Sequence, residues 1–335
     1  MSNVAIFVPH IGCPARCSFC NQHIISGQGQ RVSAADVRRI LDTALENERH
    51  AENQIAFFGG SFTAMEREYI KELLDAAAAY RKSFAGIRIS TRPDAIDEEM
   101  LTFLKAYGVT AIELGAQSMD DEVLRLNRRG HTAEDVERAS RLIRAGGFEL
   151  GLQMMTGLYG DTPEKAVDTA KRFVALNPQT VRIYPTVVLE GTELDRLYKA
   201  GAYTPQTVEQ AVELCVRLIP IFEDAGIRII RLGLHASEDV GGKKTAGAYH
   251  PAFRELCMAR IYYDNALSVL EGLPEGAYTL AVGSGHVSQM TGQKKENIKK
   301  LAAAGYAVRI REDSRLPAYR VKIINEGTGN QTQCI

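Results

Sequence analysis

Three cysteines near the start of the chain have the residue type and spacing of a metal site. Cys13, Cys17 and Cys20 form the pattern Cys-x3-Cys-x2-Cys, and the next cysteine is Cys215. Thiolates bind iron and zinc, and an ordinary four-iron cluster takes four of them. Three thiolates on one short loop would leave one metal position open, and open positions are where metal sites carry out chemistry.

Three interpretations of this loop are open on the residues alone. The first is a zinc site with His23 as the fourth ligand, although structural zinc sites usually join two separate chain segments. The second is a set of unrelated buried thiols, which the clustering of three cysteines between Gly12 and Asn21 disfavours. The third, which we favour, is a four-iron, four-sulfur cluster with one iron that lacks a protein ligand.

The composition is that of an ordinary globular protein. The 335 residues are 45% hydrophobic and 24% charged, with a net charge of −1,. No apolar run approaches the length of about 18 residues that spans a membrane, and Met1 to Pro9 lacks the basic segment and cleavage site of a signal peptide. We therefore expect a cytoplasmic protein without membrane contact, whose six cysteines serve metal binding rather than disulfides,.

The end of the chain is basic. From His286 to Ile335, nine Lys and Arg residues oppose four Asp and Glu residues. Such an excess of positive charge can follow a phosphate backbone. It is also common on solvated surfaces, and both interpretations stay open.

Alternating strand and helix patterns fill residues 1–190. Ser33 suits a helix N-cap, and the residues after it repeat apolar side chains at helical spacing. Strands are expected at 4–9, 54–58, 86–90, 111–115, 149–155 and 180–184. Such alternation predicts parallel strands with right-handed crossovers. The expected fold class is therefore α/β, a partial (β/α)6 barrel of the TIM type over residues 1–190.

Residues 191–335 break this rhythm. We expect them to form an α+β extension that packs on the edge of the barrel rather than an independent domain. The expected helices lie at 207–223 and 252–271, and the expected strands at 227–232, 278–282, 307–310 and 319–324. The segment Gly241–Gly247 is rich in glycine and lysine and is a candidate mobile lid, but it lacks the spacing of a phosphate-binding loop,.

The chemistry of a parallel barrel gathers at the C-terminal ends of its strands. The cysteine loop follows the first predicted strand, and Gly59-Gly60 follows the second, where a glycine pair lets a ligand approach the backbone closely,. Arg, Gln and Ser side chains at such ends suit carboxylate groups and ribose hydroxyls, although ordinary loop hydrogen bonding explains them as well. The polar and aromatic residues at the later strand ends are Ser90, Arg92, Gln117, Arg129, Gln153 and Tyr184.

The cysteine spacing, with the aromatic Phe19 just before Cys20, resembles the signature of the radical S-adenosylmethionine (SAM) superfamily. The resemblance implies a [4Fe-4S] cluster on Cys13, Cys17 and Cys20, whose free iron binds SAM. It further implies a 5′-deoxyadenosyl radical that takes hydrogen from a substrate, and a one-electron donor such as flavodoxin or ferredoxin. In such enzymes the cofactor carries the chemistry and the protein supplies orientation.

The same resemblance implies a set of cofactor contacts. In the family, a Gly-Gly turn at this place holds the amino group of SAM, and Gln117, Arg129 and Gln153 fall at SAM-contacting positions. The cofactor-binding residues that we expect are Phe19, Asn21, Gly59, Gly60, Ser61, Ser90, Arg92, Gln117, Arg129 and Gln153.

Longer strings narrow the resemblance to the radical domain of the Elongator catalytic subunit, which modifies the wobble uridine of tRNA. The similarity runs over residues 4–258, and its departures leave the substrate open. From the sequence we expect neither the acetyltransferase domain nor the basic extension of that subunit, and Ser90 stands where the family usually has Glu. The matching strings include Gly59-Gly-Ser-Phe-Thr63, Thr91-Arg-Pro-Asp94, Asn127-Arg-Arg-Gly-His131 and Tyr249-His-Pro-Ala-Phe253.

Three functional hypotheses follow. The resemblance and the basic tail favour a radical enzyme that acts on tRNA, whereas the neutral overall charge favours one that acts on a small molecule or a peptide. The third hypothesis is a non-enzymatic iron–sulfur or zinc-binding protein. The candidate catalytic residues are Tyr184, His235, Tyr249 and His250, with His131 and Tyr159 as further candidates on the substrate side.

Overall fold

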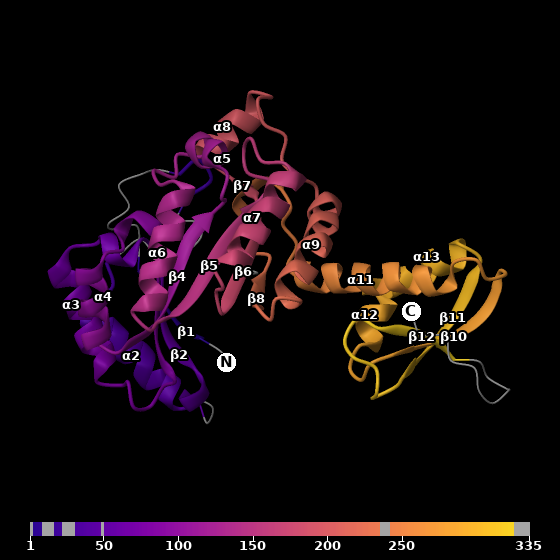
Figure 1. Ribbon diagram of the computed structural model, residues 1–335, viewed down its shortest axis with the longest axis horizontal. Coiled ribbons are helices and arrows are strands. Elements are labelled where there is room, and N and C mark those ends of the chain that lie inside the picture. The colour runs from indigo at the N-terminus through magenta and orange to yellow at the C-terminus, as the bar shows by residue number, and fades with distance from the viewer. Residues whose placement is uncertain (1–2, 9–16, 22–30, 48–49, 235–241, 325–335) are drawn as a thin grey trace. The chain divides into compact units, whose positions relative to one another are not determined.

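A parallel sheet of seven strands forms the core of the computed structural model, which describes residues 3–8, 17–21, 31–47, 50–234 and 242–324. The strand order is β1-β2-β3-β4-β5-β6-β8, and the sheet curls into an open half-barrel (Figure 1). The predicted fold class, a partial TIM-like barrel, is confirmed. The strands are β1 (Asn3–Val8), β2 (Gln54–Gly59), β3 (Gly86–Thr91), β4 (Val109–Gln117), β5 (Glu149–Thr156), β6 (Thr180–Pro185) and β8 (Arg228–Leu232).

Helices connect successive strands and cover the outer face of the curled sheet (Figure 1). Their starts follow the chain's own capping signals: the side chains of Ser33 and Thr132 each accept a hydrogen bond from the third helical residue and complete a capping box,. The helices are α2 (Ala34–Leu45), α3 (Arg67–Ala78), α4 (Glu98–Ala106), α5 (Asp121–Leu126), α6 (Ala133–Ala145), α7 (Pro163–Ala175), α8 (Glu193–Lys199) and α9 (Val208–Glu223).

The last strand of the sheet lies beyond the predicted end of the repeats at residue 190. β8 pairs in parallel with β6, with Thr180 opposite Arg228. The prediction of six strands was therefore one strand short. The local pattern predicted a strand at 227–232. It did not predict that this strand pairs with β6, because the long connection between the two strands contains α8 and α9.

The segment that we expected to be a lid is in part a strand. β9 (Lys244–Gly247) pairs in antiparallel fashion with β7 (Val187–Leu189). Gly247 has φ +99°, and a Cβ at this position would lie 2.7 Å from the carbonyl oxygen of Thr186, so the close approach requires glycine,. Gly241 lies outside the described residues.

The two faces of the sheet differ in chemistry. Alternate strand residues such as Ile55, Ile89 and Leu114 are fully buried on one face, as period-two alternation requires. The inward face instead carries Arg88 and Glu113, which are also almost fully buried. A closed TIM barrel fills its interior mainly with branched apolar side chains. The polar interior here therefore indicates a functional space rather than a packed core.

A second compact unit comprises Val212–Arg217 and His250–Ile335, and we call it the C-terminal unit; Met1–Ala211 and Leu218–Tyr249 form the barrel unit. The C-terminal unit contains a three-stranded sheet with the order β11-β10-β12. The expectation that residues 191–335 pack on the barrel edge stays a prediction. The elements are α11 (Phe253–Leu270), β10 (Gly276–Val282), α12 (Val287–Thr291), α13 (Glu296–Ala303), β11 (Tyr306–Glu312) and β12 (Val321–Ile324).

Among the described helices, none combines the length and the apolar character needed to cross a membrane.

Candidate functional site at the C-terminal edge of the sheet

The described part of the cysteine loop is a turn that is tied down at both sides. Cys17 is buried and Cys20 is partly buried, and the Cys20 amide donates to the Cys17 carbonyl oxygen at 3.2 Å. Between them, the hydroxyl of Ser18 donates to Oδ1 of Asn127 at 2.7 Å. The Ser18 carbonyl oxygen accepts from the amide of Leu194 at 2.7 Å. Both thiols are therefore held in place by residues that lie far away in the sequence.

Cys13 and His23 lie outside the described residues. Within the described ranges, no group of three His, Cys, Asp or Glu side chains is arranged to hold a metal ion. The assignment of Cys13, Cys17 and Cys20 as three ligands of one cluster, and the alternative with His23, thus remain predictions about the ligand set.

Arg129 connects the cysteine turn to the end of β4. Its Nη1 donates to Sγ of Cys17 at 3.0 Å, and its Nη2 donates to the carbonyl oxygen of Gly115. The guanidinium also lies over the ring of Phe19, 5.8 Å from the centroid. A guanidinium donor suits a negatively charged sulfur, and the thiolate is the form in which cysteine binds a metal. The donor set therefore fits an iron–sulfur cluster.

One buried polar atom of this arginine and one of Gln117 have no protein partner in the described part of the chain. Among the described residues, neither Nε of Arg129 nor Oε1 of Gln117 has a hydrogen-bond partner, although both side chains are less than 10% exposed. Gln117 also has a positive φ of 70°, which is uncommon for a residue with a side chain,. Buried polar groups are usually satisfied, so these atoms fit a polar ligand such as SAM, which offers a carboxylate and ribose hydroxyls.

Gly59 and Gly60 form a tight turn at the end of β2. The Gly60 amide donates to the carbonyl oxygen of Val8 at 2.9 Å. Gly59 has φ +112°, and a Cβ there would lie 2.3 Å from the same oxygen. Glycine is thus required by backbone packing between β2 and β1, which places the turn at the edge where the cysteine loop begins. The expected contact with the amino group of SAM stays a prediction.

The hydroxyl groups that follow β2 and β3 bind one another. Oγ of Ser61 lies 3.0 Å from Oγ1 of Thr91, and Oγ1 of Thr63 lies 2.6 Å from the same atom. Ser61 also accepts from the amide of Arg92 at 3.2 Å. The Arg92 guanidinium forms a two-pronged ion pair with Asp94 at 2.8 and 2.6 Å. In this structure, Ser61 and Arg92 therefore stabilise the loops that carry the site.

Asn21 and Tyr159 lie at the same edge. Nδ2 of Asn21 donates to the carbonyl oxygen of Glu190 at 3.3 Å. Phe19 and Tyr159 both pack against the buried cluster of Val188, Leu194 and Tyr203. The predicted residues Phe19, Cys17 and Arg129 are thus brought together, with Tyr159 nearby on the same cluster.

The interior of the half-barrel contains a charged network that sequence reasoning missed. Both carboxylate oxygens of Glu113 accept from Arg182, at 2.7 and 2.9 Å, and Arg88 donates to Oε1 at 3.3 Å. Gln153 donates to Glu113 at 2.8 Å and lies 3.4 Å from Oγ of Ser90. The available signal was a charged residue in the middle of an apolar strand, as in Ile112-Glu-Leu114.

Tyr184 continues this interior layer toward the C-terminal edge. Burial raises the pKa of its hydroxyl, and the charges of Arg182 and Glu113 act on it. The hydroxyl therefore stays protonated at neutral pH and can donate a hydrogen bond to a substrate. Tyr184, Gln153 and Ser90 are the predicted residues that lie inside the half-barrel.

Four other candidates lie elsewhere or cannot be placed. Tyr249 packs against Val187 and Leu189, with Nζ of Lys244 5.8 Å from its ring centroid. His250 belongs to the C-terminal unit, where its Nδ1 accepts from the amide of Ala252 at 3.1 Å. His131 is buried, and its Nε2 lies 3.1 Å from the carbonyl oxygen of Ala116. His235 lies outside the described residues.

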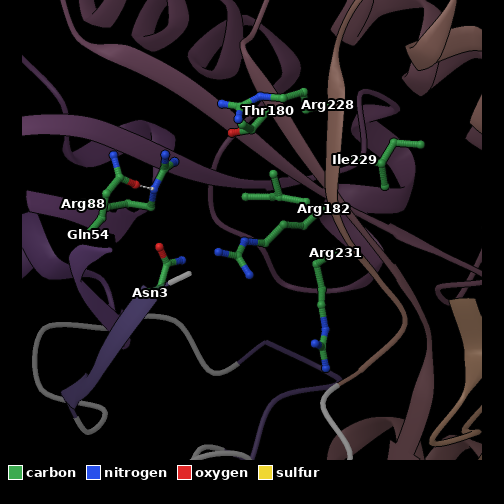
Figure 2. Close-up of a pocket in the computed structure, with 9 residues that line it drawn as sticks. Asn3, Gln54, Arg88, Thr180, Arg182, Arg228, Ile229 and Arg231 are labelled. Atoms are coloured by element: carbon green, nitrogen blue, oxygen red, sulfur yellow. Dashed lines mark hydrogen bonds between the residues drawn. The ribbon is translucent and has the colours of Figure 1, made fainter. Parts of the chain in front are cut away.

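A cationic pocket of about 470 Å³ opens at the opposite, N-terminal edge of the sheet (Figure 2). Arg88, Arg182 and Arg228 line it, and the carboxylates that pair with them are Glu113 and Glu149. With Arg231, four guanidinium groups line the pocket against these two carboxylates, so its lining carries an excess of positive charge. Also lining the pocket are Asn3, Gln54, Thr180, Ile229, Ile230 and Arg231.

The sequence matches two family models that together extend from β1 into α11. The model described as the radical SAM superfamily matches residues 7–173, and the one described as the radical SAM C-terminal domain matches residues 178–263. The curated relatives and solved structures that resemble the chain agree with this match.

One relative is the tRNA uridine(34) acetyltransferase of Methanocaldococcus infernus, with 32% identity over 186 residues, or 48% of this chain and 34% of that protein. Another is the human Elongator complex protein 3, with 29% identity over 236 residues, or 63% of this chain and 42% of that protein. The chain thus spans between about a third and two fifths of the length of these relatives.

A solved structure shares the fold. The archaeal Methanocaldococcus infernus Elp3 with an N-terminal deletion superposes with a TM-score of 0.62 at 21% identity, covering 82% of this chain and 70% of that one.

Proposed function

Because the chain belongs to the radical SAM superfamily, we propose that it is a radical enzyme whose cofactors lie at the C-terminal edge of the half-barrel and whose substrate reacts inside it. The predicted enzyme class and the cofactors, a [4Fe-4S] cluster and SAM, are those of this family. The position of the substrate and the identity of the residues that touch it are our proposal.

The residues that would hold the cofactors come from the segments that follow two strands, β1 and β4. Cys17 and Cys20, with Cys13, would ligate the cluster, and Arg129 and Gln117 would bind SAM beside it. When bound, these groups supply a 5′-deoxyadenosyl radical that takes a hydrogen atom from a substrate. The chain's own contribution is to orient SAM through the buried donors and acceptors of Arg129 and Gln117 and to keep the loop in one geometry.

The observation that carries the proposal is the position of Arg129. One guanidinium contacts a cysteine sulfur of the metal-binding motif and the backbone of β4, and it retains a buried Nε without a protein partner in the described chain. A group of this kind suits the negatively charged end of a ligand that lies next to the metal.

The interior network shapes the space where a substrate would react. Glu113 fixes Arg182 and Gln153 through hydrogen bonds of 2.7 to 2.9 Å, so these side chains cannot rearrange freely. Gln153 and Tyr184 then present polar groups toward the C-terminal edge. Rigid polar groups in a secluded space orient a substrate and protect a reactive radical from water.

The test is anaerobic SAM cleavage. After reconstitution of the cluster and reduction by dithionite or by flavodoxin or ferredoxin, the wild-type chain should form 5′-deoxyadenosine, and Cys17→Ala should form none. Cys215→Ala is the matched control, since it removes a buried cysteine of the C-terminal unit. Loss of 5′-deoxyadenosine and of iron in the control as well, or its formation by Cys17→Ala, would contradict the proposal.

The names of the relatives favour tRNA as the substrate, with modification at a wobble uridine as the reaction. The cytoplasm, expected from the sequence, is the compartment that we propose. The basic segment after His286 supports the same choice, because positive charge binds a phosphate backbone,. Turnover should then rise on addition of bulk tRNA and disappear after its digestion by ribonuclease. Full turnover in extracts freed of RNA would instead indicate a small molecule or a peptide.

A further inference from the structure

The C-terminal unit contains two helices joined by a four-residue loop and set between two parallel strands. The order is β10, α12, the loop Gly292-Gln-Lys-Lys295, α13 and β11, and β10 pairs in parallel with β11 from Gly276–Tyr306 to Val282–Glu312. β12 forms an antiparallel pair with the other edge of β10. We call the residues Gly292 to Lys295 the helix-joining loop.

The apolar pattern of this segment explains why it folds in this way. Met290 at the end of α12 and Leu301 in α13 are both fully buried in one cluster with Leu280 and Val282 of β10. Alternate residues of β11 also pack against that cluster. Both helices therefore cover the same face of the small sheet, and the loop between them is left at the surface.

The shape of the helix-joining loop is strongly determined. Gly292, Lys294 and Lys295 all have positive φ, at 74°, 49° and 63°. The amide of the buried Asn297 donates to the carbonyl oxygens of Met290 and Ala259, at 3.1 and 2.8 Å, and so ties α13 to α12 and α11. Two lysines in the left-handed region are a local cost. The Lys295 amide donates to the Gly292 carbonyl oxygen at 3.1 Å and closes the loop into a tight turn ahead of α13.

The charge of the surface around the loop is strongly positive. Between Gly276 and Ile324 the chain has nine Lys and Arg residues against three Asp and Glu residues. Among these basic residues, Lys300 pairs with Glu296 at 2.7 Å and Arg315 pairs with Asp313 at 2.9 Å.

Lys294 and Lys295 are exposed at the loop itself, and Lys299 is exposed one turn into α13. No ion pair joins any of these three lysines to an acidic side chain within the described residues. The loop therefore presents a concentrated positive charge on a fixed backbone, and a polyanion is the partner whose charge fits it.

These features together point to a particular kind of ligand. A short loop that begins with glycine, of the form Gly-x-x-Gly, clamps the backbone of four nucleotides in the RNA-binding KH modules. Gly292-Gln-Lys-Lys295 has the length and the first glycine of such a loop, whereas lysine replaces the second glycine. The lysine can contact a phosphate through its side chain where the backbone cannot approach as closely.

We propose that the C-terminal unit binds single-stranded RNA through the helix-joining loop, with Lys294 and Lys295 on consecutive phosphates. The inference deepens the proposed function, because it gives the RNA substrate a docking site apart from the reacting centre. It rests on the proposed function only for the identity of that RNA, and binding itself requires neither the cluster nor SAM.

The test uses the full chain and fluorescence anisotropy with a labelled single-stranded RNA of twelve nucleotides. Lys294→Asp/Lys295→Asp reverses both charges, and aspartate tolerates positive φ. We expect its affinity for the RNA to fall roughly tenfold or more. The plot of log affinity against log salt should also become less steep by about 1.4, because two phosphate contacts on a single strand are lost. Lys294→Ala/Lys295→Ala should show a smaller loss in the same direction.

The matched control is Arg309→Asp/Lys322→Asp, which reverses two charges of the same unit on β11 and β12, outside the helix-joining loop. It should retain more of the affinity. Equal losses in both double variants would mean diffuse charge attraction and would overturn the assignment. So would equal binding of a duplex RNA, or no binding by the wild type at low salt.

The failure of this inference can be told apart from failure of the proposed function. Cys17→Ala should bind the RNA as tightly as the wild type, since the loop does not depend on the cluster. RNA binding without any 5′-deoxyadenosine would leave the inference standing and sink the proposed function. SAM cleavage by a chain that binds no single-stranded RNA would support the proposed enzyme and overturn the RNA-binding inference.

Discussion

Nη1 of Arg129 donates a hydrogen bond to Sγ of Cys17 at 3.0 Å, although 112 residues separate them in the sequence. The contact joins the end of β4 to the metal-binding turn. It also positions the guanidinium so that its second nitrogen reaches the carbonyl oxygen of Gly115. This side chain thus adds a direct link between the sheet and the cysteine turn, beside the contacts of Ser18 with Asn127 and Leu194.

Replacement of this arginine should weaken SAM binding. A hydrogen bond to a charged group contributes roughly 1.5 to 3 kcal/mol, so Arg129→Ala should lose about one to two orders of magnitude in SAM affinity. Arg129→Lys should recover little of it, because an ammonium group cannot reproduce the planar fork. Calorimetry with the anaerobically reconstituted chain measures both values, and the iron content reports on the cluster separately.

Arg125→Ala is the matched control, since Arg125 is an exposed arginine in α5 on the same segment. Its SAM affinity should equal that of the wild type. An Arg129→Ala variant with normal iron content and unchanged SAM affinity would show that the guanidinium serves the loop alone.

The charge of Glu113 should matter for stability. Its side chain is 1% exposed and forms ion pairs with Arg182 and Arg88. Glu113→Gln keeps the volume but removes the carboxylate that pairs with Arg182, whereas Arg88 keeps its ion pair with Glu149 at 2.7 Å. Removal of one partner from a buried pair costs roughly 3 to 5 kcal/mol. Urea unfolding should show this loss, as a lower midpoint with a similar slope.

Glu99→Gln tests whether the effect comes from burial. Glu99 also pairs with an arginine, Arg67, at 2.7 Å, but its side chain is 85% exposed. Exposed ion pairs contribute little, so its unfolding midpoint should stay near that of the wild type. Equal midpoints for the two variants would contradict the role that we give to the interior network.

Substitution of Gly59 should damage the turn at the end of β2. In Gly59→Ala, the new Cβ would lie 2.3 Å from the Val8 carbonyl oxygen, so the backbone of β1 or β2 must move. Gly191→Ala is the control, because Gly191 also has a positive φ, at 75°, but nothing lies within 4 Å of its Cβ position. The control should lose about 1 kcal/mol from backbone strain.

Gly59→Ala should lose clearly more free energy of unfolding than Gly191→Ala. Its iron content after reconstitution should also fall, because the adjoining cysteine loop would shift. Similar denaturation midpoints for the two alanine variants would show that the turn adapts without cost.

His131 should make stability depend on pH. Burial first, and then the charge of Arg129, lowers its pKa from 6.5 to about 4. Between these values the unfolded chain binds a proton that the folded chain does not, so folding is favoured less as the pH falls below 6.5. The contribution of His131 to the free energy of unfolding should decrease by about 2 kcal/mol when the pH is lowered from 7 to 5.

The measurement compares the wild type with His131→Gln, whose amide can still donate to the Ala116 carbonyl oxygen but does not titrate. The difference between their unfolding free energies should shift against the wild type as the pH falls. A pH-independent difference would mean that the pKa of His131 is the same in the folded and the unfolded chain.

Much of the local architecture could be predicted from the sequence. The helix after Ser33 begins and ends where its cap and apolar spacing indicate, at Ala34–Leu45. The strand expected at 149–155 is β5, Glu149–Thr156. Such elements depend on residues that are neighbours in the chain, so a local pattern suffices. The cysteine motif is likewise local, and its family assignment is confirmed by the match to the radical SAM model.

The environment of the site could not be predicted in this way. Whether Glu113 meets Arg182 depends on the register of β4, β5 and β6, because these residues lie 69 positions apart. The side-chain period of two places each residue on a face of the sheet, but it does not say which residue of the neighbouring strand lies opposite.

The sequence by itself determined the metal-binding residue types, the alternation of strands and helices and the basic end of the chain, since each is written in consecutive residues. Only the tertiary structure decided that Arg129 contacts Cys17 and that β8 joins the sheet. It also decided that α12 and α13 leave the helix-joining loop, with Lys294 and Lys295, at the surface. These contacts arise from packing between distant segments, and the free energy that selects them is a property of the whole fold rather than of any one segment.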